Sequence, residues 1–560
     1  MRIWKRLLGT ALCLCAAVCV MSVSVSAEGE HTEHPICGNI DKCTNPDHSD
    51  GNHGDDVTWK AWNGTDEITY TDNTAYVYLT GSATQGSTIQ VTDGKTLNLC
   101  LNGMTLSSTF TVIEVKGGAT LNICDCKGGG IIAAANSKRA AIKVTPSSDS
   151  TATLNLYGGE VSGSVYDYTF DESIIELGSS FGGSKAVFNM YGGKVQNSNS
   201  VSSCSAVFVT NRSACKINIY GGEVICNNGY GIGAGYSGDA PILIAGGTVA
   251  GGNAALSVLG NLTLSGSPTL KHTNEGGADV RITTTNVAET EHDHITVSDD
   301  FTPAEGTKVS VKKSVDSSGS VLIAKPEAGQ PLTDKAQHFV SAEEGYFVES
   351  NSNGDLQLTA CAITEQPTAG NSYTVTANGS DDKVKYQWYS AKKGDVPVTD
   401  ENAAKGVNYR YNKYSGWYAD YQASSTASVN LGAFTLHMNA GDVLKLTEAS
   451  GGDRFSLADS NNDPVNPDEA SRMSCTYTAP ADGEYTLTVT ATPREHTSNG
   501  VTHYFLNASF KATVTADVPD KELSGQTAAA LNTSQLETGS YICKVTWENK
   551  TTLNSQTVRY

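Results

Sequence analysis

The chain has 560 residues, of which 39% are hydrophobic, 17% are charged and 56 are glycine. This composition is typical of a turn-rich β protein with many short strands, and it excludes a helical bundle or a coiled coil. At about 100–200 residues per domain, the length allows three to five domains. The formal net charge of −21 repels phosphate groups, so nucleic acids and anionic membranes are poor candidate partners.

Residues 1–27 have the features of a secretory signal peptide. Lys5 and Arg6 form a basic start, an apolar run covers residues 7–20, and small residues precede Glu28. The alternative is an uncleaved transmembrane anchor. Because no later run of about 18 apolar residues exists, we do not expect the mature chain to span a membrane. We expect a secreted, extracellular protein, either free or associated with the cell surface.

Histidines and cysteines gather in a polar head at residues 28–56. The pattern C-x5-C-x4-H-x4-H supplies two thiolates and two imidazoles, which suit a tetrahedral structural zinc ion. These residues are Cys37, Cys43, His48 and His53, with His34 as a spare ligand. The head has few apolar residues, so zinc or a Cys37–Cys43 disulfide would be its source of order. A head with neither is the third alternative.

A short repeat recurs between residues 87 and 270. The clear copies read apolar, Asn, apolar, any residue, the later ones continue with Gly-Gly, and the weaker copies replace the Asn. The clear copies are Leu97–Cys100, Leu121–Cys124, Leu154–Gly159, Phe188–Gly193 and Ile217–Gly222, and the weaker ones are Ile242–Gly247 and Leu262–Gly266. Period-two alternation predicts short strands, and stacked coils of this length bury a continuous core. We predict an all-β chain with a right-handed parallel β-helix at 57–294 and a strand-rich cap at 295–360.

Stacking in register places like side chains above one another. With the apolar positions inward, the asparagines are expected to form an outward column, each side-chain amide bonded to the next. This column comprises Asn98, Asn122, Asn155, Asn189 and Asn218. The next outward column comprises Cys100, Cys124, Tyr157, Tyr191 and Tyr220.

The second column suggests two kinds of chemistry. Coils lie about 4.8 Å apart, which suits a Cys100–Cys124 disulfide, although Cys126 competes for Cys124. Three of the 14 cysteines lie in the leader, so the remaining 11 cannot all pair within the chain. The three tyrosines are candidates to bind sugar rings, with the asparagines as polar neighbours. The alternative is that they only stabilise the sheet.

A polysaccharide lyase or hydrolase on this scaffold would need clustered carboxylates. The best acidic cluster is Asp167, Asp171 and Glu172, in one loop, and no column repeats Asp on adjacent coils. Glu291–His294 is a candidate metal-binding group. A solvated loop and a polar connection are the plainer interpretations of these two segments.

The C-terminal region predicts an immunoglobulin-like domain that is split by an insert. Tyr541 stands two residues before Cys543, as in a tyrosine corner, and Trp388 matches the buried Trp of an earlier strand. The separation of 155 positions from Trp388 to Cys543 exceeds a whole domain of about 100 residues. The split domain is therefore 361–394 and 521–560, and the inserted β-sandwich or jelly roll is 395–520.

Three further expectations concern this region. The strand expected at 373–377 lacks a cysteine, so Cys543 is either free or paired with Cys361. Thr527–Asn532 is expected to be a later strand of the split domain. In the insert, Tyr411 and Trp417 belong to an aromatic segment that is either a glycan-binding patch or an inward-packing strand.

The order of these features resembles that of secreted surface proteins of Gram-positive gut bacteria. The resemblance rests on the leader, the His/Cys head followed by Trp59–Trp62, the segment Leu99–Gly103, the repeated Tyr-Gly-Gly coils and the immunoglobulin-like tail. The insert more weakly resembles bacterial pre-peptidase C-terminal or carbohydrate-binding sandwiches. The family implies adhesion or glycan contact and brings no catalytic motif, and the chain shows no wall-sorting tail of the kind that anchored relatives carry.

The leading hypothesis is therefore a non-enzymatic extracellular surface or adhesion protein that contacts glycans or cell-surface protein ligands. The first alternative is a polysaccharide-degrading β-helix enzyme with accessory binding modules. The second is a structural spacer without a ligand.

Overall fold

The structure is a computed structural model that describes residues 58–560 apart from several internal segments. These segments are 146–149, 166–172, 179–184, 211–214, 235–239, 259–260, 284–293, 305, 314–319, 369–372, 398–428, 448–453, 471–473, 492–493, 499–500, 506–510 and 535. Two units make up the chain. The first comprises residues 1–316, 321–342 and 350–357, and the second comprises 317–320, 343–349 and 358–560.

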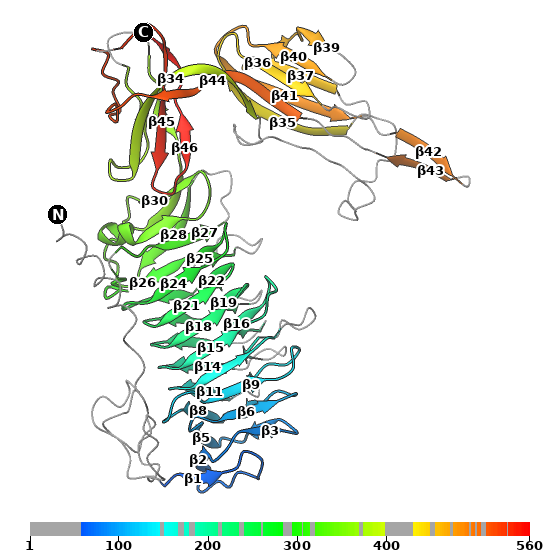
Figure 1. Cartoon of the computed structure of the whole chain (residues 1–560), viewed down its shortest axis with the longest axis vertical. Helices are drawn as coiled ribbons and strands as arrows, with labels where there is room; N and C mark the ends of the chain where they lie inside the picture. Colours follow the sequence, from blue (N-terminus) through cyan, green and yellow to red (C-terminus); the bar gives the residue numbers. More distant parts are fainter. Residues whose placement is uncertain are drawn as a thin grey trace, which may run out of the picture. The chain divides into compact units, whose positions relative to one another are not determined.

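Three parallel sheets run along the first unit, and from β2 to β25 the chain visits them in turn, once per coil (Figure 1). Beyond β25 it alternates between the first and the third sheet. The first sheet contains, in order, β1 (Lys60–Trp62), β2 (Thr74–Leu79), β5 (Thr96–Cys100), β8 (Thr120–Cys124), β11 (Thr151–Leu156), β14 (Lys185–Met190), β17 (Lys216–Ile219), β20 (Ile242–Ile244), β23 (Leu262–Leu264), β26 (Ile295–Val297) and β28 (Ser320–Pro326).

The other two sheets follow the same cycle. The second sheet contains β3 (Ala83–Gln85), β6 (Thr105–Ser108), β9 (Ile131–Ala134), β12 (Glu160–Gly163), β15 (Lys194–Asn197), β18 (Glu223–Cys226), β21 (Thr248–Gly251) and β24 (Thr269–His272). The third contains β4 (Ile89–Val91), β7 (Ile113–Lys116), β10 (Ile142–Thr145), β13 (Ile175–Leu177), β16 (Ser205–Val209), β19 (Tyr230–Ala234), β22 (Ala254–Val258), β25 (Ala278–Ile282), β27 (Val309–Lys313) and β29 (Phe339–Ser341). A 3-10 helix, η3 (Thr333–His338), precedes β29, and β30 (Tyr346–Ser350) and β31 (Leu356–Ala360) follow it.

The coils stack in the register that the repeat predicts. Leu154 pairs with Phe188, and Phe188 pairs with Ile217, so like positions lie one above another on β11, β14 and β17. All three side chains are completely buried. The alternation of apolar and polar residues therefore builds one continuous core between the three sheets, and the arrangement is consistent with a right-handed parallel β-helix.

The Gly-Gly pairs that follow β11, β14 and β17 have a steric cause. A Cβ at Gly221 would lie 2.6 Å from the carbonyl oxygen of Tyr191 on the preceding coil. Gly222 has φ +80°, and a Cβ there would lie 2.6 Å from the carbonyl oxygen of Gly193. The chain turns the corner between the first and second sheets here, and only residues without a Cβ allow adjacent coils to approach so closely.

Antiparallel sheets form the second unit. The largest has the order β39 (Glu469–Ala470), β40 (Cys475–Thr478), β36 (Val443–Thr447), β44 (Lys511–Glu522), β34 (Val384–Pro397), β45 (Ser540–Trp547) and β46 (Thr552–Asn554), with β47 (Val558–Arg559) also paired to β45. A second sheet has the order β35 (Val429–Met438), β41 (Gly483–Ala491), β37 (Arg454–Asp459) and β38 (Pro464–Val465). Two further pairs are β32 (Ile363–Glu365) with β33 (Thr376–Ala377), and β42 (Arg494–Ser498) with β43 (Val501–Phe505).

The second unit has two hydrophobic cores, which the long strands β34 and β44 connect. One core contains Trp388 and Cys543, which lie opposite each other on β34 and β45. The hydroxyl of Tyr541 donates to the carbonyl of Glu537 at 2.6 Å, which is the tyrosine corner expected from the sequence. The other core lies between the strands of the insert and contains Leu444.

The segment Thr527–Asn532 differs from the expectation. It forms no named strand, and only an isolated bridge joins Ala530 to Thr374. The indole nitrogen of Trp388 donates to the carbonyl of Ala528 at 3.0 Å, so the segment is fixed to the core by a side chain in place of a strand ladder. Cys361 and Cys543 are both free thiols.

We predict that Gly222→Ala destabilises the solenoid by about 1–3 kcal/mol, because alanine at this φ is strained and its methyl meets a backbone oxygen. Gly86→Ala is the matched control, since nothing lies within 4 Å of a Cβ there. Urea unfolding followed by circular dichroism measures both variants. Equal unfolding midpoints for the two would contradict the steric explanation.

Candidate functional site

A continuous ladder of asparagine amides lies on the outward side of the first sheet. Each Nδ2 donates to the Oδ1 of the preceding coil, so every internal member both gives and accepts one hydrogen bond. The bonds are Asn122 to Asn98 at 2.7 Å, Asn155 to Asn122 at 2.7 Å, Asn189 to Asn155 at 2.8 Å and Asn218 to Asn189 at 2.7 Å. The hydrogen-bonded ladder predicted from the repeat is confirmed.

The two ends of this ladder differ. At its start, Asn98 Nδ2 donates to the carbonyl of Ala75 at 3.2 Å. At its other end, Asn218 Oδ1 has no hydrogen-bond partner within the described part of the chain, because Leu243 occupies the next position of the column. Asn98 and Asn218 are only 2% and 4% exposed, although the column faces outward.

Three stacked tyrosines form a second ladder beside the asparagines. The rings of Tyr157 and Tyr191 have centroids 4.8 Å apart at an angle of 14°, and those of Tyr191 and Tyr220 are 5.3 Å apart at 7°. These spacings are close to the separation of neighbouring strands, so each coil contributes one ring. Tyr220 is 39% exposed, whereas Tyr157 and Tyr191 are half-buried. The ladder therefore offers most of its open aromatic surface at Tyr220.

Cysteines continue the tyrosine column on the preceding coils. Cys100 and Cys124 lie in register on β5 and β8, as predicted, and both are free thiols. The Sγ atoms of Cys100 and Cys126 lie 3.4 Å apart. A hydrogen bond with Cys124 and burial raise the pKa of Cys100 to about 12. The predicted Cys100–Cys124 disulfide thus remains a prediction, and Cys126 is a competing partner for Cys100.

A second thiol pair was not found by the sequence reasoning. Cys204 and Cys226 are buried, and their Sγ atoms lie 3.2 Å apart. Their shared hydrogen bond and burial raise the pKa of Cys204. The 22-residue separation approximates one coil, and this was the signal that could have revealed the pair. It was missed because neither cysteine belongs to the Asn-containing repeat.

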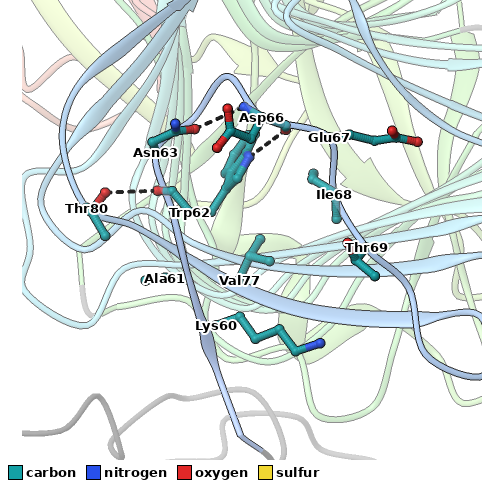
Figure 2. Close-up of a pocket in the computed structure, with 10 residues that line it drawn as sticks. All are labelled: Lys60, Ala61, Trp62, Asn63, Asp66, Glu67, Ile68, Thr69, Val77 and Thr80. Carbon is teal, nitrogen blue, oxygen red and sulfur yellow. Dashed lines mark hydrogen bonds between the residues drawn. The ribbon is translucent and has the colours of Figure 1, made fainter.

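A cavity of about 350 Å³ lies at the N-terminal end of the solenoid (Figure 2). It is lined by Lys60, Ala61, Trp62, Asn63, Asp66, Glu67, Ile68, Thr69, Val77 and Thr80. The indole nitrogen of Trp62 donates to the carbonyl of Asp66 at 2.9 Å and thereby holds the loop that forms one wall. The predicted glycan-binding residues do not line this cavity.

His272, Asp279 and Ser310 form a hydrogen-bonded group near β24 and β25. Asp279 Oδ1 lies 2.8 Å from His272 Nδ1, and the hydroxyl of Ser310 lies 3.4 Å from the same nitrogen. In a catalytic Ser-His-Asp triad, the serine hydroxyl and the carboxylate contact opposite nitrogens of the imidazole. Asp279 Oδ2 instead accepts from the backbone N–H of Ser310 at 2.8 Å, so the group links adjacent coils.

Several predicted site residues lie outside the described residues. They are the zinc candidates Cys37, Cys43, His48, His53 and His34, the acidic loop residues Asp167, Asp171 and Glu172, and the aromatic candidates Tyr411 and Trp417. The leader and most of the segment Glu291–His294 also lie outside them. Within the described ranges, no group of three or more His, Cys, Asp or Glu side chains is placed to hold a metal ion. No helix in these ranges is both long and apolar enough to cross a membrane.

Comparison of the chain with models of protein families, with curated proteins and with solved structures found no significant match in any of the three.

We predict that Asn155→Ala destabilises the solenoid more than Asn218→Ala does. The first change removes two ladder bonds and leaves two neighbouring amides without partners, whereas the second removes one bond at the end. The expected cost is about 1–3 kcal/mol for Asn155→Ala. Urea unfolding midpoints give the comparison, and a reversed order would show that the ladder is not a continuous stabilising element.

We also predict that Cys204 and Cys226 form a disulfide on exposure to oxidised glutathione, because their sulfurs are already in contact. Each thiol loses its proton, one disulfide bond forms, and the glutathione disulfide is reduced to two thiols. A crosslink across a loop of this size is expected to stabilise the protein by about 3 kcal/mol. Peptide mass mapping identifies the bonded pair, with Cys226→Ser as the control. Mapping that finds these two cysteines bonded only to other partners would contradict the prediction.

Proposed function

We propose that the protein is a non-enzymatic extracellular surface protein that contacts carbohydrate through the outward face of its first sheet. The observation that supports this most strongly is the pairing of two ladders, one of stacked tyrosine rings and one of amides, on the same face of successive coils. Sugars bind proteins through C–H groups laid on aromatic rings and through hydroxyls that bond to polar side chains.

The regular stack also fits this role. Coils repeat at about 4.8 Å, so the side chains on this face keep fixed positions and lose little freedom when a ligand binds. Neutral amides and phenols at these positions match the neutral hydroxyl-rich surface of a glycan. The leader predicted at residues 1–27 would bring the protein to the compartment where such glycans occur.

The proposal extends to the class of protein. The order of leader, head, solenoid and immunoglobulin-like tail supports a place among surface proteins of Gram-positive gut bacteria. In that setting the solenoid would present the ligand-binding face, and the antiparallel second unit would serve as a further recognition module or as a spacer. Zinc in the Cys/His head belongs to the same proposal as a structural element.

Polysaccharide cleavage is the competing function. Glycoside hydrolysis uses two carboxyl groups about 5–10 Å apart across the scissile bond. The two outward columns of the first sheet carry asparagine and tyrosine at the positions where a pair of carboxylates would be needed. Binding without product formation is therefore the behaviour expected from this face.

We predict that the protein binds a subset of polysaccharides on a glycan array without releasing reducing ends. The double variant Tyr191→Ala, Tyr220→Ala is expected to weaken binding about tenfold or more, since each ring contact is worth about 1 kcal/mol. Phe110→Ala is the matched control, because Phe110 is a 52% exposed aromatic residue of the solenoid outside both ladders.

Three outcomes would contradict the proposal. Release of sugar products by the wild-type protein would favour the enzyme. Absence of binding to every glycan would favour a spacer. Equal loss of affinity in the control and ladder variants would place binding elsewhere.

A further inference from the structure

The cavity of Figure 2 lies where the core of the solenoid reaches its first coil. Lys60 on β1 pairs in register with Val77 on β2. Val77 begins a column of buried apolar residues that continues with Leu99, Ile123 and Leu156. Because residues in register on neighbouring strands share a face of the sheet, Lys60 is the first member of this inward column. A lysine therefore lies at the mouth of the apolar core.

One wall of the cavity is a short loop that hydrogen bonds hold in place. The indole nitrogen of Trp62 donates to the carbonyl of Asp66 at 2.9 Å, and Asn63 Oδ1 accepts from the backbone N–H of Asp66 at 2.9 Å. Gly64 has φ +84°, and a Cβ there would overlap the Cβ of Ala83, so the loop packs closely on β3. A wall fixed in this way needs little reordering when a ligand enters.

Charged groups flank the apolar middle of the cavity. Figure 2 shows Lys60 on one side of Val77 and Ile68, and Asp66 and Glu67 on the other. Among the described residues, none of the three charged side chains takes part in an ion pair. The hydrogen bonds drawn at Asp66 use its backbone, so its carboxylate stays available. The cavity thus offers one cation, two carboxylates and an apolar surface between them.

This arrangement matches a short zwitterion. A carboxylate accepts hydrogen bonds from an ammonium group, and a lysine donates to a carboxylate. The volume of about 350 Å³ lies near the lower end of the range for small-molecule sites, about 300–1,000 Å³. A ligand whose two charges contact opposite sides needs several bonds between them, which a dipeptide has and a single α-amino acid lacks. Because two carboxylates face one lysine, an anion without an amino group is disfavoured.

We infer that the cavity binds a free dipeptide with an apolar side chain. The ammonium group of the ligand contacts Asp66 and Glu67, its carboxylate contacts Lys60, and its side chain lies on Ile68 and Val77. The inference goes beyond the proposed function, because the asparagine and tyrosine ladders do not line this cavity. Glycan binding and dipeptide binding can therefore fail separately.

The first experiment measures binding of the dipeptide Ala-Leu to the full chain by isothermal titration calorimetry. Two modified probes separate the charges, since an N-acetylated form lacks the ammonium group and a C-amidated form lacks the carboxylate. Each is expected to bind about tenfold or more weakly than Ala-Leu, because each loses one charge-assisted contact. Equal affinities for the three probes, or no binding of Ala-Leu, would overturn the inference.

Lys60→Met removes the cation and keeps the length of the side chain. It is expected to weaken Ala-Leu binding about tenfold and to leave binding of the C-amidated probe unchanged. Because an apolar residue suits the inward column, the unfolding midpoint is expected to stay the same or to rise. Lys138→Met is the matched control, since Lys138 is exposed and lies outside the cavity. An equal loss for both probes would overturn the contact between Lys60 and the ligand carboxylate.

A second variant tests the other side of the cavity at two exposed positions. The double change Asp66→Asn, Glu67→Gln is expected to weaken Ala-Leu binding about tenfold or more and to change binding of the N-acetylated probe little. Glu275→Gln with Asp334→Asn is the matched control, because both acids are exposed in the same unit and lie outside the cavity. If Lys60→Met fails to fold, an unchanged preference of this double variant for Ala-Leu over its N-acetylated form still overturns the inference.

Discussion

The register between successive coils is the constraint on which the first unit depends. A coil cannot bury its apolar side alone, so each one uses its neighbours as the other half of its core. Once Leu154, Phe188 and Ile217 are fixed above one another, every other position of the coil is fixed as well. The same register that closes the core therefore aligns the amides and the rings on the outside. A shift by one residue would reverse inside and outside along the strand.

In a ladder of identical side chains, each internal member contacts the same residue type on both neighbouring coils. Only the two end members contact something different. The asparagine ladder begins on a backbone carbonyl and ends on Asn218 Oδ1, which has no hydrogen-bond partner among the described residues. The tyrosine ladder begins against buried cysteines and ends on an exposed ring. Asn218 lies on β17 and Tyr220 directly follows it, and the repeat weakens on the next coil, at β20.

The second unit is packed differently from the solenoid. The long strands β34 and β44 belong to one sheet that contributes to two separate cores. Each core contains a tyrosine whose hydroxyl donates a hydrogen bond to the backbone carbonyl four residues earlier. Tyr541 donates to Glu537, and Tyr485 donates to Ala481 at 2.7 Å. This contact fixes the turn that precedes a core strand. Because this contact is local, the sequence pattern of the immunoglobulin-like domain can be recognised although more than 100 residues separate its two parts.

The sequence by itself determined the solenoid, the order of its columns, the asparagine ladder and the tyrosine corner, because each follows from local alternation repeated at a nearly constant interval. It did not determine which cysteine contacts Cys100, the Cys204–Cys226 contact or the cavity beside Trp62. Nor did it show that the two end amides, Asn98 and Asn218, are buried or that Tyr220 is the most exposed ring of its ladder. Those features depend on side-chain direction at corners and on the residues of the following coil. Only the packed tertiary structure fixes these distances, because the loops between strands vary in length and leave corner positions outside the repeat.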